Sequence, residues 1–164
     1  MTQEPHALSP KQVQQAYEEL VGSVRVGNLL TLQDGRPFGS HVPFLPGYDW
    51  TSIYLHLSGL AHHTQNLRAN PLVSVFVSEP DRPERNPLAL KRLNLLGTGA
   101  PLAESAVDYA RVKDAYIRKF PQSAMLFDFA DFQLWELRME QAHFVLGFGQ
   151  AFGAQASNPQ HWIH

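Results

Sequence analysis

Asp34-Gly35 lies between two segments with strand-like residues, and this dipeptide is typical of a two-residue β-turn. We therefore predict an antiparallel hairpin from segments 24–32 and 37–45. In the second segment larger side chains alternate with small or polar ones: Phe38, Ser40, Val42 and Phe44 against Gly39, His41 and Pro43. Because Pro43 has no backbone N–H, this arm is expected at a sheet edge or a bulge.

Strand patterns recur along the rest of the chain, at 51–57, 72–78, 88–100, 133–139 and 143–148. Helical patterns are fewer, at 10–22, 58–70 and 104–119, with a short helix or turn at 126–132 and a solvated loop at 79–87. Residues 150–164 show no period and are expected on the surface or against another subunit. Strands without regular βαβ alternation predict a mainly β fold, a closed or nearly closed antiparallel barrel of six to seven strands with flanking helices.

The composition limits the class of protein. With 164 residues, 44% of them hydrophobic, one domain is expected: a helix in 1–22, the barrel in 23–152 and a tail in 153–164. No apolar run reaches the ~20 residues of a membrane span and the start is polar, so we predict a cytoplasmic protein without a membrane partner. A net charge of −2 without a basic block predicts no nucleic-acid partner.

The absence of cysteine excludes disulfides, a thiolate nucleophile and cysteine-ligated metal. The eight histidines are scattered, and the adjacent pair His62-His63 lacks the i, i+4 spacing of a helical metal site, so no metal site is predicted. No nucleophile with an attached base and no acid–base pair is marked by spacing. The catalytic residues are thus unknown, and any chemistry would come from a cofactor.

Residues 58–70 are predicted to form a short helix between two strands, with Ser58 as N-cap and Asn70-Pro71 as its end. Leu60, Thr64 and Leu67 would form its buried face. Free N–H groups in the first turn, together with His62-His63, could hold a phosphate. Alternatively, Ser58 only caps a crossover helix and the histidines face water.

A polar stripe marks the strand predicted at 88–100, where Arg92, Asn94 and Thr98 alternate with Leu93, Leu95, Gly97 and Gly99. Its partner could be solvent, a cofactor or a second subunit. The aromatic residues Trp135 and Phe148 lie in apolar alternation, so both are predicted to be core residues rather than cofactor contacts.

Four motifs occur in the order seen in the FMN-binding split-barrel proteins related to pyridoxamine 5′-phosphate oxidase, and the chain most resembles their haem-utilisation branch. These motifs are GSHVPF at 39–44, LSGLAHHTQNL at 57–67, KRLNLLG at 91–97 and GFGQA at 147–151. The resemblance covers roughly residues 10–152. It implies a homodimeric split barrel with FMN in two symmetric clefts between the subunits, and a flavin-dependent oxidoreductase acting on an unknown small substrate.

Carried over by position, the resemblance implies that the backbone of Ser40, His41 and Val42 lies beside the flavin ring. It places Ser58, His62, His63 and Thr64 at the phosphate, and Arg92 against the flavin. The chain departs from the oxidase where arginine and lysine clamp the phosphate, because those positions read His41, Ala61, His62 and His63. The substrate-binding pattern of the oxidase is not recognisable, so pyridoxal phosphate synthesis is not predicted.

The alternative is a haem-binding or haem-degrading protein on the same barrel. Loss of the fixed phosphate-clamping charges favours this interpretation, and so does the tail HWIH at 161–164, since imidazole is a suitable axial ligand for haem iron. A third interpretation, a non-enzymatic ligand-binding dimer, also stays open at this point.

Overall fold

The computed structural model describes residues 8–147, 149–155 and 158–163. Its strands form one antiparallel sheet with the order β2-β1-β5-β6-β7-β4-β3, to which β8 and β9 are added beside β7. The strands are β1 (Val26–Gln33), β2 (Arg36–Pro43), β3 (Leu45–Pro46), β4 (Ser52–Ser58), β5 (Leu72–Ser78), β6 (Arg92–Pro101), β7 (Phe132–Gly147), β8 (Gln150–Gln155) and β9 (Asn158–Ile163). The helices are α1 (Pro10–Ser23), α2 (His62–Ala69) and α3 (Tyr109–Lys119), with 3₁₀-helices η1 (Pro87–Ala89) and η2 (Pro121–Asp128).

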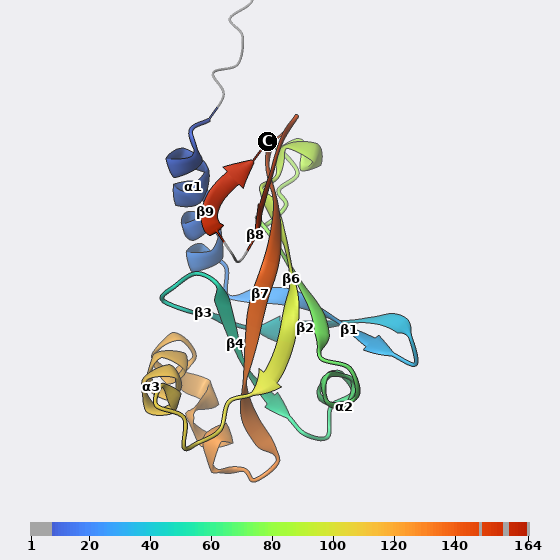
Figure 1. Cartoon of the computed structure of the whole chain (residues 1–164), viewed down its shortest axis with the longest axis vertical. Coiled ribbons are helices and arrows are strands. Elements are labelled where there is room, and N and C mark those ends of the chain that lie inside the picture. Colours follow the sequence, from blue (N-terminus) through green and yellow to red (C-terminus); the bar gives the residue numbers. More distant parts are fainter. Residues whose placement is uncertain (1–7, 148, 156–157, 164) are drawn as a thin grey trace, which may run out of the picture.

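The seven strands of the main path curl into a half-barrel around one core (Figure 1). One face of the sheet, called here the inner face, carries the fully buried Leu29, Val75, Leu95 and Leu137. Removing each such side chain from water contributes about 1.5–3 kcal/mol, so burial on this face stabilises the fold substantially. The predicted mainly β fold, an antiparallel split barrel with flanking helices, is confirmed.

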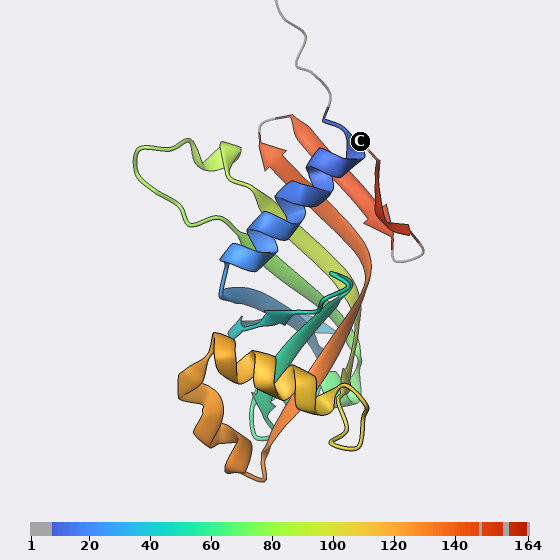
Figure 2. The same cartoon turned by 90° about the vertical axis from the view of Figure 1, so that its left-hand side faces the viewer.

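Helix α1 covers the inner face at one end of the sheet (Figure 2). It begins as predicted, because Ser9 and Gln12 form a capping box and Pro10 occupies the first turn. Its buried side chains are Val13, Tyr17, Leu20 and Val21. The pattern of capping residues and apolar spacing therefore predicted this helix to within one residue of its observed end.

The C-terminal segment differs from the prediction of an irregular tail. Strands β8 and β9 form a hairpin beside β7, and β9 lies next to α1 (Figures 1 and 2). Trp162 is 5% exposed, contacts the rings of Tyr17 and Phe144, and donates from Nε1 to Gln14 Oε1 at 2.8 Å. These contacts explain the order of a segment without a clear period. The predictions for Phe148 and His164 lie outside the described residues.

Strand β7 is one continuous strand of 16 residues where the sequence predicted two. The alternation of apolar and polar residues changes near Glu140, but the strand continues because a register shift, or β-bulge, lies opposite Leu96 and Gly97. A side chain at Gly97 would collide with the carbonyl group of Arg138, so the close approach of the two backbones requires glycine. Trp135, in the first half of β7, is a core residue as predicted.

The hairpin β1–β2 is confirmed, with Asp34 at φ 50° and Gly35 at φ 74° in the turn. Strand β2 lies at the edge of the sheet, as Pro43 predicted. Two other predicted elements are shorter than expected. Residues 87–89 form η1 rather than the start of β6, and residues 104–108 precede α3, where Val107 is fully exposed.

Helix α2 corrects the prediction for residues 58–70. It begins after Ala61, so Ser58 is the last residue of β4 and not the N-cap, while Asn70 ends the helix as predicted. Thr64 and Leu67 are buried, but Leu60 is 78% exposed because it lies in the turn before the helix. Asn66 is buried instead and donates to Thr31 Oγ1 at 3.0 Å.

Figure 2 shows α3 at the end of the sheet far from α1. Tyr54 and Leu134, which lie beneath α3 and η2, alternate along β4 and β7 with the core residues Leu55 and Trp135, so these helices cover part of the opposite, outer face. A second apolar cluster lies beneath them, formed by Tyr54, Val112, Tyr116, Phe120 and Leu134. The outer face over β2, β1, β5, β6 and the second half of β7 lies outside this cover in the described residues. This uncovered region is called the open face.

Candidate functional site

The first surface lies where β2 meets the start of α2. Ser40 Oγ and His63 Nδ1 are 3.1 Å apart, and the ring of His62 lies 6.0 Å from that of Phe38. Burial and the neighbouring His62 hold the pKa of His63 below its ordinary value, so His63 is neutral at pH 7. The structure therefore brings together Ser40, His62 and His63 from the set predicted to bind the cofactor.

The other predicted residues do not join this cluster. Val42 is buried in the core, so only its backbone is available to a ligand. Ser58 Oγ donates to Asp131 Oδ2 at 2.7 Å and accepts from Leu60 N at 3.2 Å. The carboxylate of Asp131 would repel a phosphate placed at this hydroxyl.

Thr64 and Arg92 also lie in different parts of the structure, the first inside the core and the second on the outer face. Thr64, in the first turn of α2, is fully buried, and its Oγ1 has no hydrogen-bond partner among the described residues. Arg92 lies on the outer face and donates from Nη1 to the carbonyl oxygens of Leu88 and Leu90, at 3.3 and 3.2 Å. Its guanidinium group thus fixes the loop before β6. The predicted cofactor-binding set is therefore divided between the two faces of the sheet, with Arg92 on the outer face and Ser40 and His63 on the inner side.

The second surface is the open face. The register of five neighbouring strands aligns its residues in two rows that run across the sheet. The first row is His41, Asn28, Phe76, Asn94 and His143. The second row is Gly39, Leu30, Ser74, Leu96 and Gln141. Residues directly opposite one another in a ladder point to the same face, so each row is a continuous strip of side chains.

Asn94 and His41, both in the first row, have side-chain partners on this face. Ser74 Oγ donates to Asn94 Oδ1, which gives the predicted polar stripe a partner within the sheet. His41 Nδ1 lies 3.1 Å from Asn28 Oδ1. The sequence prediction missed Asn28 and His143 as neighbours of the stripe, although counting outward from the turn at Asp34-Gly35 pairs Asn28 with His41.

An apolar groove of about 450 Å³ lies on the open face. Its lining includes Leu30, Leu32, Pro37, Leu72, Ser74 and Leu96. Among the described residues, none lies within 4 Å of the point where a side chain at Gly39, beside Leu30, would begin. The groove is therefore open toward β2, and its surface is one that an apolar ring system could cover.

A more polar hollow of about 590 Å³ lies between this groove and α3. Its charges are largely paired with one another, with Arg111 3.1 Å from Asp108 and Arg138 3.4 Å from Glu136. Arg111 also lies 4.9 Å from the ring centroid of Tyr48. Because these groups already neutralise each other, the hollow is a weaker candidate than the apolar groove.

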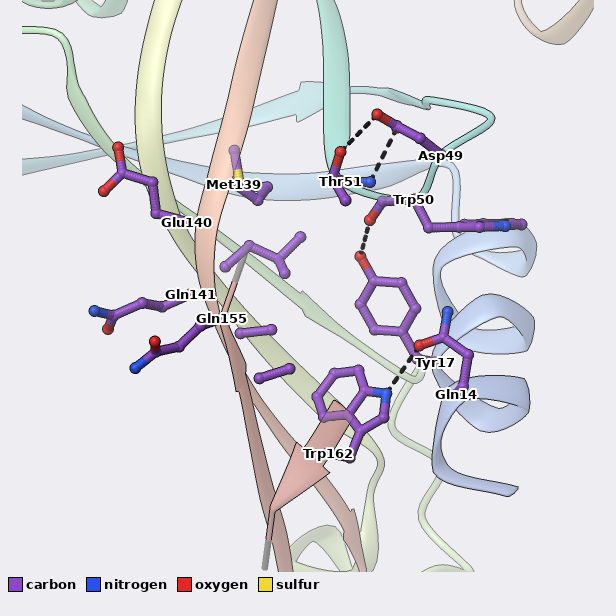
Figure 3. Close-up of a pocket in the computed structure, with 13 residues that line it drawn as sticks. Gln14, Tyr17, Asp49, Trp50, Thr51, Met139, Glu140, Gln141, Gln155 and Trp162 are labelled. Carbon is purple, nitrogen blue, oxygen red and sulfur yellow. Dashed lines mark hydrogen bonds between the residues drawn. The ribbon is translucent and has the colours of Figure 1, made fainter. Parts of the chain in front are cut away.

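A cavity of about 30 Å³ lies between α1 and β7 (Figure 3). Tyr17 donates from its hydroxyl to the carbonyl oxygen of Trp50 at 2.8 Å, and burial raises the pKa of Tyr17. Figure 3 shows Trp162 closing the cavity beside Gln14. This volume holds little more than one water molecule, so the cavity is a packing void rather than a ligand site.

Comparison with known proteins gives this geometry a context. A protein-family model described as "CREG, beta-barrel" matches residues 11–162. The haem oxygenase HutZ of Vibrio cholerae is 28% identical over 131 residues, which are 79% of this chain and 73% of that protein. The haem oxygenase HOZ of Arabidopsis thaliana is 35% identical over 119 residues, 73% of this chain but 35% of the longer relative.

Solved structures show the same fold. A haem-binding protein from Mycobacterium smegmatis has a TM-score of 0.81 at 24% identity, covering 95% of this chain and 62% of that one. A putative pyridoxamine 5′-phosphate oxidase from Listeria innocua has a TM-score of 0.63 at 18% identity, covering 82% and 99%. The resemblance to the split-barrel proteins and their haem-utilisation branch is thus confirmed, and in the described residues no helix has the length and apolar character to span a membrane. The family match extends over nearly the whole chain, which therefore belongs to the CREG β-barrel family.

Proposed function

We propose that this protein binds haem and supports its breakdown, using the open outer face of the barrel. The observation that carries the proposal is the similarity to HutZ and HOZ, two haem oxygenases that match 79% and 73% of the chain. Both alignments extend well beyond a single motif. This proposal takes up the haem alternative from the sequence in place of the flavin oxidoreductase.

The residues of the open face fit haem. The groove of about 450 Å³ offers Leu30, Leu72 and Leu96 to an apolar macrocycle, and the imidazole of His41 is exposed on the same face. Apolar side chains would exclude water from the macrocycle, and an imidazole nitrogen is a suitable ligand for the iron. Bound haem would supply an iron centre capable of redox chemistry, while the protein binds and orients it.

FMN has weaker support as the cofactor. The Listeria structure, at 18% identity, is a neighbour in fold alone. Ser40 and His63 favour a polar ligand near α2, but Asp131 accepts a hydrogen bond from the Ser58 hydroxyl where a phosphate was predicted. The substitution of imidazoles for arginine and lysine removes charge-assisted bonds worth about 1.5–3 kcal/mol each.

We also propose that the protein is a homodimer joined through the open face. Phe76 and Leu96 are only half-buried there, in the middle of a broad face that α3 does not cover. A second copy would shield this apolar strip from water and leave the groove between the subunits. The resemblance to the split-barrel proteins implied the same arrangement for the flavin.

Parallel titrations test the cofactor. We expect ferric haem added to ~10 μM protein to give a shifted, saturable Soret band, and FMN fluorescence to remain unquenched up to ~100 μM protein. Ascorbate added in air should then bleach the Soret band, with catalase present in every sample to remove free peroxide. A spectrum identical to free haem would refute haem binding, and a stable Soret band would refute breakdown.

A further inference from the structure

We propose that Nε2 of His41 is the protein ligand of the haem iron and that Asn28 positions this imidazole. The inference rests on the proposed haem function and assigns a residue to it. It starts from one hydrogen bond on the open face, the 3.1 Å contact between His41 Nδ1 and Asn28 Oδ1. The sequence had assigned only the backbone of His41 to a cofactor, so this side-chain contact is independent of that prediction.

The hydrogen bond determines which ring nitrogen is free. The oxygen Oδ1 of Asn28 can only accept, so His41 carries its proton on Nδ1 and donates it. The Nε2 lone pair is then available on an exposed side chain. Metal-binding histidines use this arrangement, in which the second ring N–H donates to a neighbouring oxygen that orients the ring and raises its basicity.

The position of His41 also suits the groove. Residues 39 and 41 lie on the same side of β2, about 7 Å apart along the strand, and Gly39 has open space above it. Gly39 pairs with Leu30, which lines the groove. His41 is not itself a lining residue of the groove but lies beside it on β2, and Gly39 places no side chain between the imidazole and the lining residue Leu30.

The other described histidine side chains are less suitable. His56 is 9% exposed beneath η2, and its ring stacks on Phe127 at 3.8 Å. His63 is half-buried on the inner side with its Nδ1 paired to Ser40, and His62 lies against Phe38. His143 shares the row with His41, but among the described residues its imidazole has no hydrogen-bond partner to orient it. The side chains of His6, His161 and His164 lie outside this comparison.

Variants of the full-length chain, loaded with ferric haem and then reduced, test the assignment. We expect His41→Gly to lose the iron–histidine stretching band in resonance Raman spectra and to regain a wild-type-like Soret band when imidazole is added. His143→Gly is the matched control on the same face and should keep the band. Both positions are exposed, so circular dichroism should show the folded sheet in each variant.

The positioning role of Asn28 is tested by the iron–histidine stretching frequency and the midpoint potential, which a purely structural role of Asn28 would leave unchanged. Asn28→Asp should raise the iron–histidine stretching frequency and lower the midpoint potential, because a carboxylate makes the imidazole more basic. Asn28→Ala should weaken haem binding by about tenfold. Unchanged frequency and potential in Asn28→Asp would refute the role of Asn28.

The two proposals fail in different ways. If the wild-type protein gives only the spectrum of free haem, haem binding itself is refuted, and the assignment of His41 with it. If the wild type binds haem but His41→Gly keeps the iron–histidine band, or His143→Gly loses it, then haem binding stands and the assignment of His41 is refuted.

Discussion

The outer face of the sheet has two regions: α3 and η2 cover one of them, and the other is the open face. His56 belongs to the covered region, where its ring stacks on Phe127 at 3.8 Å with an angle of 9° between the planes. Its Nδ1 is buried without a hydrogen-bond partner in the described residues. His41 belongs to the open region, where its Nδ1 has a partner in Asn28 and the ring is exposed.

The two histidines differ because one is buried beneath η2 and the other is exposed, so burial determines whether the imidazole can bind a proton or a ligand. Burial, and to a smaller extent the nearby charge of Lys113, lowers the pKa of His56 from 6.5 to about 4. His56 therefore acts as a neutral aromatic ring at pH 7. The exposed His41 instead presents a nitrogen to whatever binds the open face.

The largest expected effect concerns what covers the open region. Phe76→Asp would place a carboxylate in the middle of the proposed dimer interface, so we expect dissociation to monomers, with at least a 100-fold weaker association by order of magnitude. Light scattering at micromolar concentration measures this. Val107→Asp, on a fully exposed residue before α3, is the control and should stay dimeric. A monomeric wild type would contradict the proposed interface.

The second prediction compares the same truncation in the two regions. Leu134→Ala removes a fully buried side chain beneath α3 and should lower the free energy of unfolding by about 3 kcal/mol. Leu96→Ala on the open face should cost less than about 1 kcal/mol. Urea denaturation in the Phe76→Asp background keeps both chains monomeric. Equal losses would show that the open face is packed like the covered one.

The third prediction concerns pH. Above pH 6.5 the imidazole of His56 is neutral in both the folded and the unfolded chain. Between pH 6.5 and about 4 only the unfolded chain binds the proton, so the free energy of unfolding falls as the pH is lowered. The loss is on the order of 2 kcal/mol and is complete near the folded pKa. His56→Phe keeps the stack on Phe127 and should flatten this part of the profile. His143→Ala should leave it as in the wild type.

The smallest expected effect concerns Lys113, whose Nζ lies 5.0 Å from the ring centroid of Phe127. Lys113→Met removes a charge that disfavours protonation of His56, so the pKa of His56 should rise by a few tenths of a unit. Burial, the larger cause, remains in place. An NMR titration of the His56 ring proton measures the shift. A return to 6.5 would mean that charge, not cover, is the main cause.

Local signals in the sequence predicted the elements that local interactions determine. The capping box at Ser9 defined α1, and Asp34-Gly35 defined the hairpin and its register. Ser58 was assigned to the wrong element because its partner, Asp131, lies 73 positions away. The order of β9 likewise depends on a distant contact, between Trp162 and Gln14.

The candidate site was predictable only in part. His41 was named from the resemblance, but its pairing with Asn28 required the register of the hairpin, which the sequence contains. The apolar groove required the order of five strands, and β1 pairs with β5 across a long separation in the chain. The division of the predicted cofactor-binding set between two faces follows from that same curvature and order.

The contact between Gln14 and Trp162 joins positions separated by 148 residues. During synthesis α1 leaves the ribosome early, whereas Trp162 follows after roughly 10 s at typical elongation rates. For this interval the apolar side of α1 lacks its contact with Trp162, so part of this surface stays exposed in the nascent chain. Closure of this end of the barrel therefore follows the synthesis of β9.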